Sequence, residues 1–424
     1  MDNSNLYLKD CLYVEPFSGR IFDGDIEVEK GKEGNLRFLP KGSFSRNFID
    51  CKGKIVTRSF INSHHHIYSS LARGMPPPLK APGNFHEILK FIWWKLDVSL
   101  NREMIEVSAL TAAVESLRNG VTFVIDHHSS PGSISGSLEL ISLSLKRAGI
   151  NSLVCYELSD RNGPELLNKA LEESESVFKS GIPALVGLHA SFTVSDELLK
   201  KSVGIAEKYN SGIHIHVAES QMDNDISLET YGKRAVKRLK DSGVLEFPKT
   251  LLAHSIHINE EERKLIAESP VMIVRNPRSN LNNGVGIFDD TGLEGKILIG
   301  TDGINSDILS DVKLYYYLNG GRPDNSPWKA YNSLRRADGY LMKNSFISDR
   351  ENDLLIIDYK SPTDINKQNF FSHFIYGITS ADIKTVISVG EVVMENGVPV
   401  GIDQDDLLSR SRELGSYLWK KISD

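Results

Sequence analysis

The chain has 424 residues, 40% of them hydrophobic, and its 49 basic and 56 acidic side chains leave a formal net charge of −7. This mildly acidic composition excludes the basic surface typical of nucleic-acid-binding proteins, and no run of about 18 apolar residues predicts a membrane span. The first residues lack the pattern of a secretory signal, and three widely separated cysteines argue against a disulfide framework, so we expect a cytoplasmic protein.

Residues 1–57 alternate apolar and polar side chains between Gly and Pro residues, which predicts short antiparallel strands. Short β-branched, apolar runs then alternate with helical stretches, such as 101–119 and the helices expected to begin after Ser195 and Asn259. Nearly continuous apolar character predicts strands that are buried on both faces. There are eight such runs: 54–62, 120–126, 152–157, 184–190, 212–218, 249–254, 271–276 and 296–302.

Eight strand–helix units predict an α/β fold, a (β/α)8 TIM barrel over residues 58–345. A doubly wound open sheet is the alternative, but the Gly-rich loop typical of that fold is missing after the first strand. Residues 346–402 repeat the alternating pattern of residues 1–57, so we expect both chain ends to form one small β-sandwich domain. Residues 403–424 have the spacing of a C-terminal amphipathic helix.

The histidines are unevenly distributed along the chain. Ten of the 12 fall in five short segments at or just beyond predicted strand ends: 64–66, 127–128, 189, 214–216 and 254–257. A TIM barrel carries its active site at the C-terminal ends of its strands. The histidine positions therefore predict a functional site at that end of the barrel.

The first strand ends in three histidines. Since residues two apart share a face of a strand, His64 and His66 can both point into the barrel mouth, while His65 points away. Two imidazoles on one face can hold a divalent metal. The alternative is a polar strand end with solvated histidines, and the pattern does not exclude it by itself.

Three later strands supply further candidates. His216 ends the fifth strand and Glu219 follows it, whereas His214 lies one layer deeper, where we expect a hydrogen-bonded core residue. His254 ends the sixth strand. Asp302 ends the eighth, where an acid after an apolar run indicates either a bound cation or a helix N-cap. Together with the pair on the first strand, these residues predict a metal site.

Four motifs resemble the amidohydrolase superfamily, in particular its deaminase and triazine-hydrolase branch. They are FINSHHHIYSSLARG (60–74), HIHVAES (214–220), LLAHSIHI (251–258) and IGTDG (299–303). Within that branch, WWKLD (93–97) and NPRSNLNNGVG (276–286) are most similar to SsnA-type aminohydrolases. The resemblance runs through most of the chain.

The resemblance implies that His64, His66, His216 and Asp302 hold one divalent metal, with Zn²⁺ expected and Fe²⁺ the alternative. It also implies catalytic roles for three side chains: Glu219 shuttles protons, His254 polarises the reacting oxygen and Asp302 accepts a proton from water. The family's binuclear members use a lysine after the fourth strand, and ALVGLHASF (184–192) has none.

The activity implied by the resemblance is hydrolytic deamination of a small heterocyclic substrate of the purine, pterin or pyrimidine type. Hydrolysis of a ring amide or a C–Cl bond is one alternative, and a non-catalytic barrel scaffold is another. A homodimer is a further open prediction. The candidate substrate contacts, for some of which core packing is the alternative, are His189, Trp94, Asp97, Arg161 and Asn280.

Overall fold

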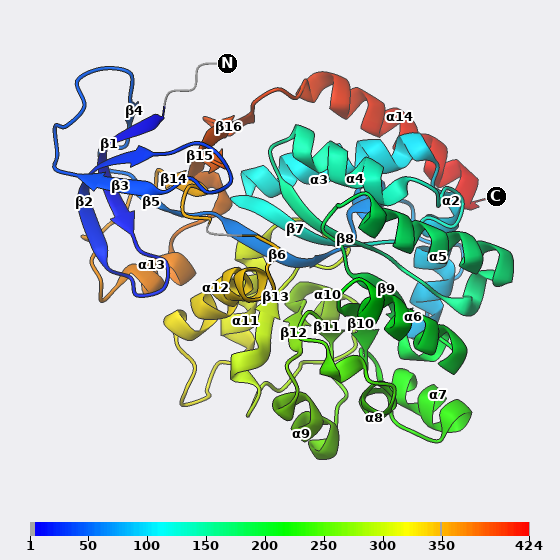
Figure 1. Ribbon diagram of the computed structural model, residues 1–424. Coiled ribbons are helices and arrows are strands. Elements are labelled where there is room, and N and C mark those ends of the chain that lie inside the picture. The colour runs from blue at the N-terminus through cyan, green and yellow to red at the C-terminus, as the bar shows by residue number, and fades with distance from the viewer. Residues whose placement is uncertain (1–4, 348–349, 424) are drawn as a thin grey trace.

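The computed structural model describes residues 5–347 and 350–423, and both chain ends contribute to its outer sheet (Figure 1). This sheet has nine strands, with the path β17-β16-β15-β14-β5-β1-β2-β3 and β4 paired to β1. Its strands are β1 Leu6–Val14, β2 Ile21–Val28, β3 Leu36–Leu39, β4 Ile49–Asp50, β5 Ile55–Arg58, β14 Leu354–Ile357, β15 Ile383–Ser388, β16 Glu391–Glu395 and β17 Val398–Pro399.

Eight parallel strands form the inner part of the molecule, as three-stranded and five-stranded sheets with the orders β6-β7-β8 and β13-β12-β11-β10-β9. Isolated bridges join β8 to the segment of β9 and His65 to Asp302 after β13. The strands are β6 Phe60–His65, β7 Val121–His128, β8 Asn151–Tyr156, β9 Val186–Ala190, β10 Ile213–Val217, β11 Leu251–His254, β12 Met272–Arg275 and β13 Ile297–Ile299.

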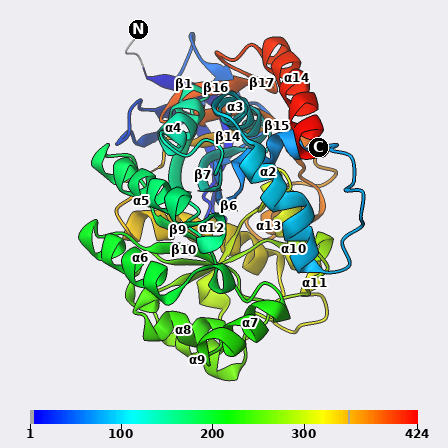
Figure 2. The same cartoon turned by 90° about the vertical axis from the view of Figure 1, so that its right-hand side faces the viewer.

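Helices surround the parallel strands in both views (Figures 1 and 2). The α-helices of the described chain are α1 Phe85–Ile88, α2 Trp94–Ser99, α3 Arg102–Arg118, α4 Ser137–Arg147, α5 Pro164–Lys179, α6 Asp196–Lys208, α7 Gln221–Tyr231, α8 Ala235–Asp241, α9 Glu260–Glu268, α10 Pro277–Asn282, α11 Ile308–Leu318, α12 Pro327–Lys343, α13 Phe370–Tyr376, which lies beside the outer sheet in Figure 1, and α14 Gln404–Ser423. In the described part of the chain, none of these helices meets the length and hydropathy needed to cross a membrane.

The predicted helix starts are confirmed by their caps. The Ser195 hydroxyl accepts a hydrogen bond from the Leu198 amide at 3.2 Å at the start of α6. Asn259 and Glu262 form a reciprocal capping box at the start of α9. Such caps satisfy amide groups that have no partner inside the helix, which fixes where each helix begins.

The prediction of one strand over 54–62 is wrong. β5 pairs with β1 and β14 in the outer sheet, whereas β6 pairs with β7 among the parallel strands. The chain changes sheets at Ser59, whose amide donates to the Asp353 carbonyl at 2.9 Å. A continuous apolar run does not reveal this change, because both strands are buried and the two pairing partners lie far apart in sequence.

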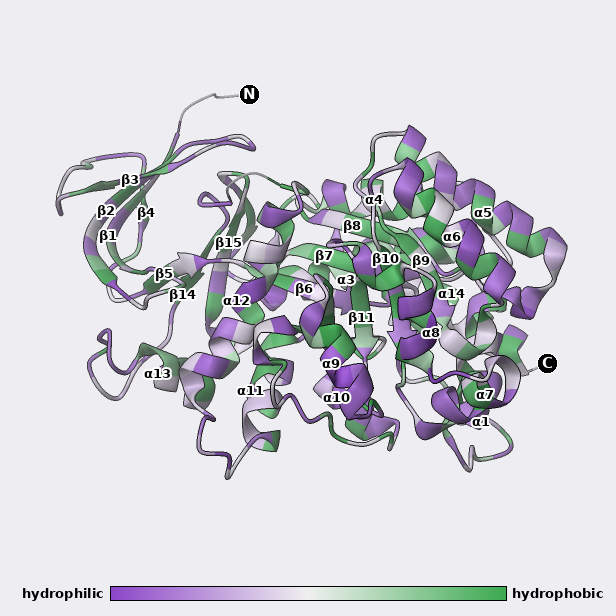
Figure 3. Ribbon diagram, turned by 60° about the horizontal axis from the view of Figure 1, so that its bottom comes forward, coloured by the Kyte–Doolittle hydropathy of each residue, from purple (hydrophilic) through white to green (hydrophobic). Residues whose placement is uncertain are grey.

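A small apolar cluster lies between the parallel strands and α12. It includes Ile61, Phe123, Leu153, Leu251 and Leu298, each at most 2% exposed. A larger apolar layer lies between the strands and the surrounding helices, and Figure 3 shows the hydrophobic strands inside helices with hydrophilic outer faces. The histidine-bearing strand ends therefore rest on a packed core that limits their movement.

Candidate metal centre and active site

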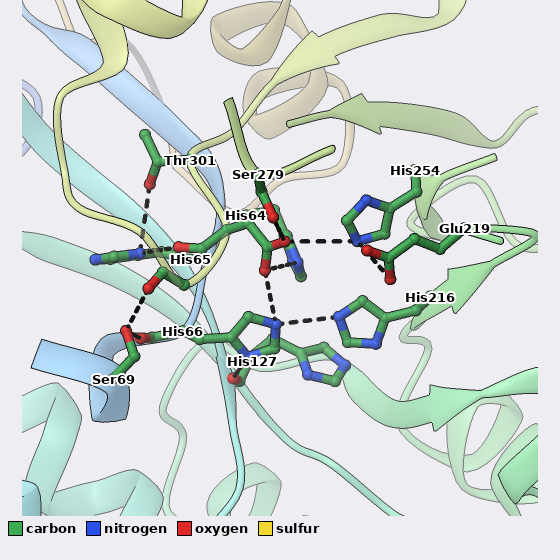
Figure 4. A network of polar contacts seen from close by, with 12 residues as sticks. His64, His65, His66, Ser69, His127, His216, Glu219, His254, Ser279 and Thr301 are labelled. Carbon is green, nitrogen blue, oxygen red and sulfur yellow. Dashed lines mark hydrogen bonds and ion pairs between the residues drawn. The ribbon is translucent and has the colours of Figure 1, made fainter. Parts of the chain in front are cut away.

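Four predicted metal ligands come together in one buried cluster. His64 lies in β6 and His66 directly after it, His216 lies in β10, and Asp302 follows β13. One ligand atom from each of the four lies within 4.8 Å of the others. Figure 4 shows the rings of His64, His66 and His216 converging from two different strands.

Two of these imidazoles present lone pairs to each other. His66 Nδ1 lies 2.7 Å from the His127 carbonyl and His216 Nδ1 lies 2.6 Å from the His189 carbonyl. Because a carbonyl only accepts, each Nδ1 carries the hydrogen, and each Nε2 of a neutral ring is then an acceptor. The two Nε2 atoms are 3.1 Å apart, an arrangement that requires a proton or a cation between them.

The other two ligands complete this arrangement. His64 Nε2 is buried without a hydrogen-bond partner in the described part of the chain, 3.5 Å from Asp302 Oδ1. Burial lowers the pKa of His64 to about 3, so its ring is neutral at pH 7. Three imidazole nitrogens and one carboxylate oxygen are suited to Zn²⁺ or Fe²⁺. The cluster therefore fits a divalent metal.

Asp302 is held as a carboxylate. Burial opposes the charged form, but the nearby imidazoles of His64 and His66 outweigh it and hold the pKa of Asp302 well below its usual range. The Ser279 hydroxyl donates to Asp302 Oδ2 at 2.5 Å. One carboxylate oxygen thus faces the histidines and the other is oriented by a serine.

The backbone at these strand ends is strained. Ala218, His254 and Asp302 have φ values of 47°, 70° and 56°, in the left-handed region that residues other than glycine rarely adopt. Each such residue costs about 1–3 kcal/mol and persists only where the surrounding structure imposes it. Three such residues thus lie at the ends of the strands that carry the histidine and aspartate cluster.

His254 presents a hydrogen-bond donor to the cluster. The Asn280 Nδ2 amide donates to His254 Nδ1 at 2.7 Å. Burial lowers the pKa of His254 to about 4, so the ring is neutral and carries its hydrogen on Nε2. That Nε2 lies 3.5 Å from Glu219 Oε2 and 3.8 Å from Asp302 Oδ2.

Glu219 lies in the loop after β10, as predicted, beside His254 (Figure 4). Its Oε1 accepts from Asn283 Nδ2 at 3.4 Å. Burial and then the charge of Asp302 raise the pKa of Glu219 well above its usual range. The carboxyl groups of Glu219 and Asp302 thus have opposed pKa shifts, an arrangement typical of acid–base chemistry.

A pocket of about 610 Å³, its open mouth included, lies over Glu219, His254 and Asp302. Four of the five predicted substrate contacts line it: Trp94, Asp97, Arg161 and His189. The fifth, Asn280, does not line the pocket but lies behind His254. Its role in the structure is to orient that imidazole.

His189 offers the pocket an acceptor. The Thr193 hydroxyl donates to the Ala190 carbonyl at 3.1 Å, and it therefore accepts from His189 Nδ1 at 2.6 Å. Burial lowers the pKa of His189 to about 3. The ring is thus neutral at pH 7, with a lone pair on Nε2.

The pocket also carries a charged network that the sequence did not predict. Glu157, which lines the pocket, lies 3.2 Å from Arg161 Nη2 and 3.3 Å from His127 Nδ1. Arg161 also pairs with Asp97 and lies over the Trp94 ring at 5.3 Å. Glu157 directly follows the apolar strand β8, the same signal that singled out Asp302.

Two further residues of the site were missed. Ser279 and Asn283, which orient Asp302 and Glu219, belong to α10 and its C-terminal end. Both fall inside the motif NPRSNLNNGVG (276–286), so the resemblance marked the segment without assigning these two residues a role.

The chain matches the Amidohydrolase family over residues 55–334, well over half of its length, and it belongs to that family. A 5'-deoxyadenosine deaminase of Methanobrevibacter smithii is 24% identical over 97% of this chain and 98% of its own. A 5-methylthioadenosine/S-adenosylhomocysteine deaminase of Aquifex aeolicus is 27% identical over 100% of both chains.

A solved structure of atrazine chlorohydrolase from Arthrobacter aurescens, complexed with zinc, has a TM-score of 0.80 at 18% identity and covers 97% of this chain and 100% of that one. At this identity the likeness concerns the fold. The predicted family, the TIM-barrel type α/β fold and the predicted class, a hydrolase, are confirmed.

Proposed function

We propose that this chain is a metal-dependent aminohydrolase that releases ammonia from an aminated nitrogen heterocycle, with adenosine derivatives as the first candidates. One observation carries the proposal: the Glu219 carboxyl and the Nε2–H donor of His254 lie 3.5 Å apart, next to a histidine and aspartate cluster that fits a divalent metal. The names of the two relatives in sequence support the choice of adenosine derivatives.

The proposed metal ligands are His64, His66, His216 and Asp302, and the proposed ion is Zn²⁺. Zinc is supported by the three-nitrogen, one-oxygen donor set and by the metal in the structurally similar chlorohydrolase. A divalent ion bound there lowers the pKa of water to about 7 and so supplies hydroxide at neutral pH.

The chain's own residues then handle the protons. Asp302 accepts a proton from water through its Oδ2 oxygen, which Ser279 orients. Glu219 gives its proton to the ring nitrogen next to the reacting carbon, which makes that carbon more electrophilic. His254 donates from Nε2 to the oxygen that gains charge. The proton held by Asp302 leaves with the amino group as ammonia. The hydroxyl proton of the intermediate passes to Glu219 as the ring carbon becomes a carbonyl, which restores both carboxyl groups to their starting states.

Pocket residues support an aromatic ring as substrate. Trp94 offers a flat apolar surface, and His189 Nε2 offers an acceptor for a ring or substituent N–H or O–H. Asp97 and Arg161 supply polar groups farther along the wall. This combination of an apolar face and a few oriented polar groups is typical of small-molecule sites.

A substrate panel tests the proposal. The zinc-loaded protein is incubated with adenosine derivatives, guanine, pterins and cytosine, and ammonia, chloride and acid release are measured. Ammonia from an aminated ring is the expected product. Chloride from a chlorinated ring, or acid from a ring amide, without ammonia from any aminated ring would contradict it. Absence of stoichiometric metal, even after reconstitution, would instead favour the scaffold alternative.

We further propose that the eight parallel strands close into a barrel over residues 58–345, flanked by a domain of residues 1–57 and 346–402 and the C-terminal helix of 403–424. The bridge from His65 to Asp302 supports closure. Three free, buried cysteines support a cytoplasmic location. The homodimer stays a prediction.

A further inference from the structure

The three imidazoles of the metal cluster differ in the hydrogen-bond partner of Nδ1, the ring nitrogen that does not face the cluster. His66 and His216 each donate from Nδ1 to a main-chain carbonyl. His64 Nδ1 instead faces a side chain, the Nε2 atom of His214 at 2.9 Å. A main-chain carbonyl cannot change its role, but an imidazole nitrogen can either donate or accept. Only for His64, among these three, does the hydrogen position depend on another side chain.

His214 is in turn held by Cys155. The Cys155 Sγ atom lies 3.8 Å from His214 Nδ1 and 3.5 Å from the Asp126 carbonyl. Since that carbonyl only accepts, the thiol hydrogen points to it, and the sulfur is left to accept from His214 Nδ1–H. A neutral His214 then has a lone pair on Nε2, which accepts from His64 Nδ1–H. The hydrogen bonds thus all point the same way: His64 donates to His214, His214 donates to Cys155, and Cys155 donates to the backbone of β7.

The direction of these hydrogen bonds decides whether His64 can bind a metal. With its hydrogen on Nδ1, His64 presents a lone pair from Nε2, the buried atom that has no hydrogen-bond partner in the described chain. In the opposite direction, His214 Nε2 would donate to His64 Nδ1. The hydrogen of His64 would then lie on Nε2 and block coordination.

We propose that His214 is a positioning residue that keeps His64 in the tautomer able to bind the metal, with Cys155 as the second link. This inference rests on the proposed function. His214 is fully buried and its ring centre lies 4.9 Å from that of His64. Water therefore cannot replace the lost acceptor easily, and the loss should weaken metal binding about 10- to 100-fold.

Three full-length variants test the role of the acceptor. His214→Leu removes it, His214→Gln keeps an acceptor oxygen at the position of Nε2, and Cys155→Ala removes the second link. Leu251→Val is the matched control, because Leu251 pairs with His214 across β10 and β11 and is equally buried but has no polar atom. Zinc dissociation constants from chelator competition, the absorption spectrum of the cobalt-substituted protein and thermal unfolding of the metal-free protein are measured.

The expected result is a 10- to 100-fold weaker zinc constant for His214→Leu, with an altered cobalt spectrum, and recovery of most of the affinity in His214→Gln. The zinc constant of Cys155→Ala should lie between those of the two His214 variants. Cys155→Ala replaces His214→Leu as the test if that variant does not fold. Leu251→Val should lose thermal stability but keep its zinc constant.

Unchanged zinc binding in folded His214→Leu or Cys155→Ala, or an equal loss in the Gln and Leu variants, would overturn the inference and leave the proposed function intact. No zinc or cobalt binding by the unchanged protein would overturn both.

Discussion

Asn280→Asp tests the hydrogen-bond donor that we assign to His254. In the structure, the Asn280 amide donates to His254 Nδ1 at 2.7 Å and so leaves the ring hydrogen on Nε2, facing Glu219 and Asp302. An aspartate at this position only accepts, so it draws the hydrogen to Nδ1 and turns the Nε2 of a neutral ring into an acceptor. The substitution changes the donor pattern with almost no change in volume.

The expected loss follows from the role of the donor. Removing one donor to a developing oxyanion costs about 10²–10³ in kcat, or about 2.7–4 kcal/mol. Because Asn280 does not line the pocket and is not a proposed metal ligand, KM and metal content should change little.

Steady-state ammonia release with the best substrate of the panel, together with metal analysis, provides the assay. Asn282→Asp is the matched control, since Asn282 lies on the same helix, is exposed and contacts neither His254 nor Glu219. It should retain the kcat of the unchanged protein. A kcat in Asn280→Asp close to that of the control would refute the assigned tautomer of His254.

Three further predictions concern the acid, the metal and the buried charge. Glu219→Gln should retain its metal but lose about 10²–10⁴ in kcat, because the proton donor is gone, and a near-normal rate would remove Glu219 from this role. Chelation should abolish ammonia release and lower the thermal unfolding temperature, and added Zn²⁺ should restore both, since a ligand that binds only the folded state stabilises it. Burial raises the pKa of Asp223 from 3.8 to about 7, so ionisation costs the folded state stability as pH rises from about 4 to 7. Asp223→Asn removes this cost, so its urea-unfolding advantage over the unchanged protein should grow with pH across that window, and a difference independent of pH would contradict the shift.

The positions of the metal cluster could be predicted because they depend on local periodicity. Side chains two apart in a strand share a face, so His64 and His66 had to point the same way once a strand was assigned. Strand ends in an α/β fold of this type meet at one edge, which brought His216 and Asp302 to the same place. The roles of the individual ligands and of Glu219 came from the resemblance to the family, not from the periodicity.

The supporting residues could not be predicted in the same way. Asn280 was expected to contact substrate, and the packing of α10 brings its amide to His254 at the end of β11, a contact that no local pattern indicates. His214 was expected to be a core residue, and the hydrogen bond to His64 joins residues 150 positions apart. No local pattern determines which nitrogen of a buried ring will meet which distant atom.

By itself the sequence determined the alternation of strands and helices, the helix caps at Ser195 and Asn259, and the strand ends at which histidines gather, because these depend on residues close together in the chain. Only the tertiary structure decided the split of the first predicted strand, the tautomers of His64 and His254 and the raised pKa of Glu219. These depend on hydrogen-bond partners, burial and charges that come from distant segments and act only after the strands have packed together.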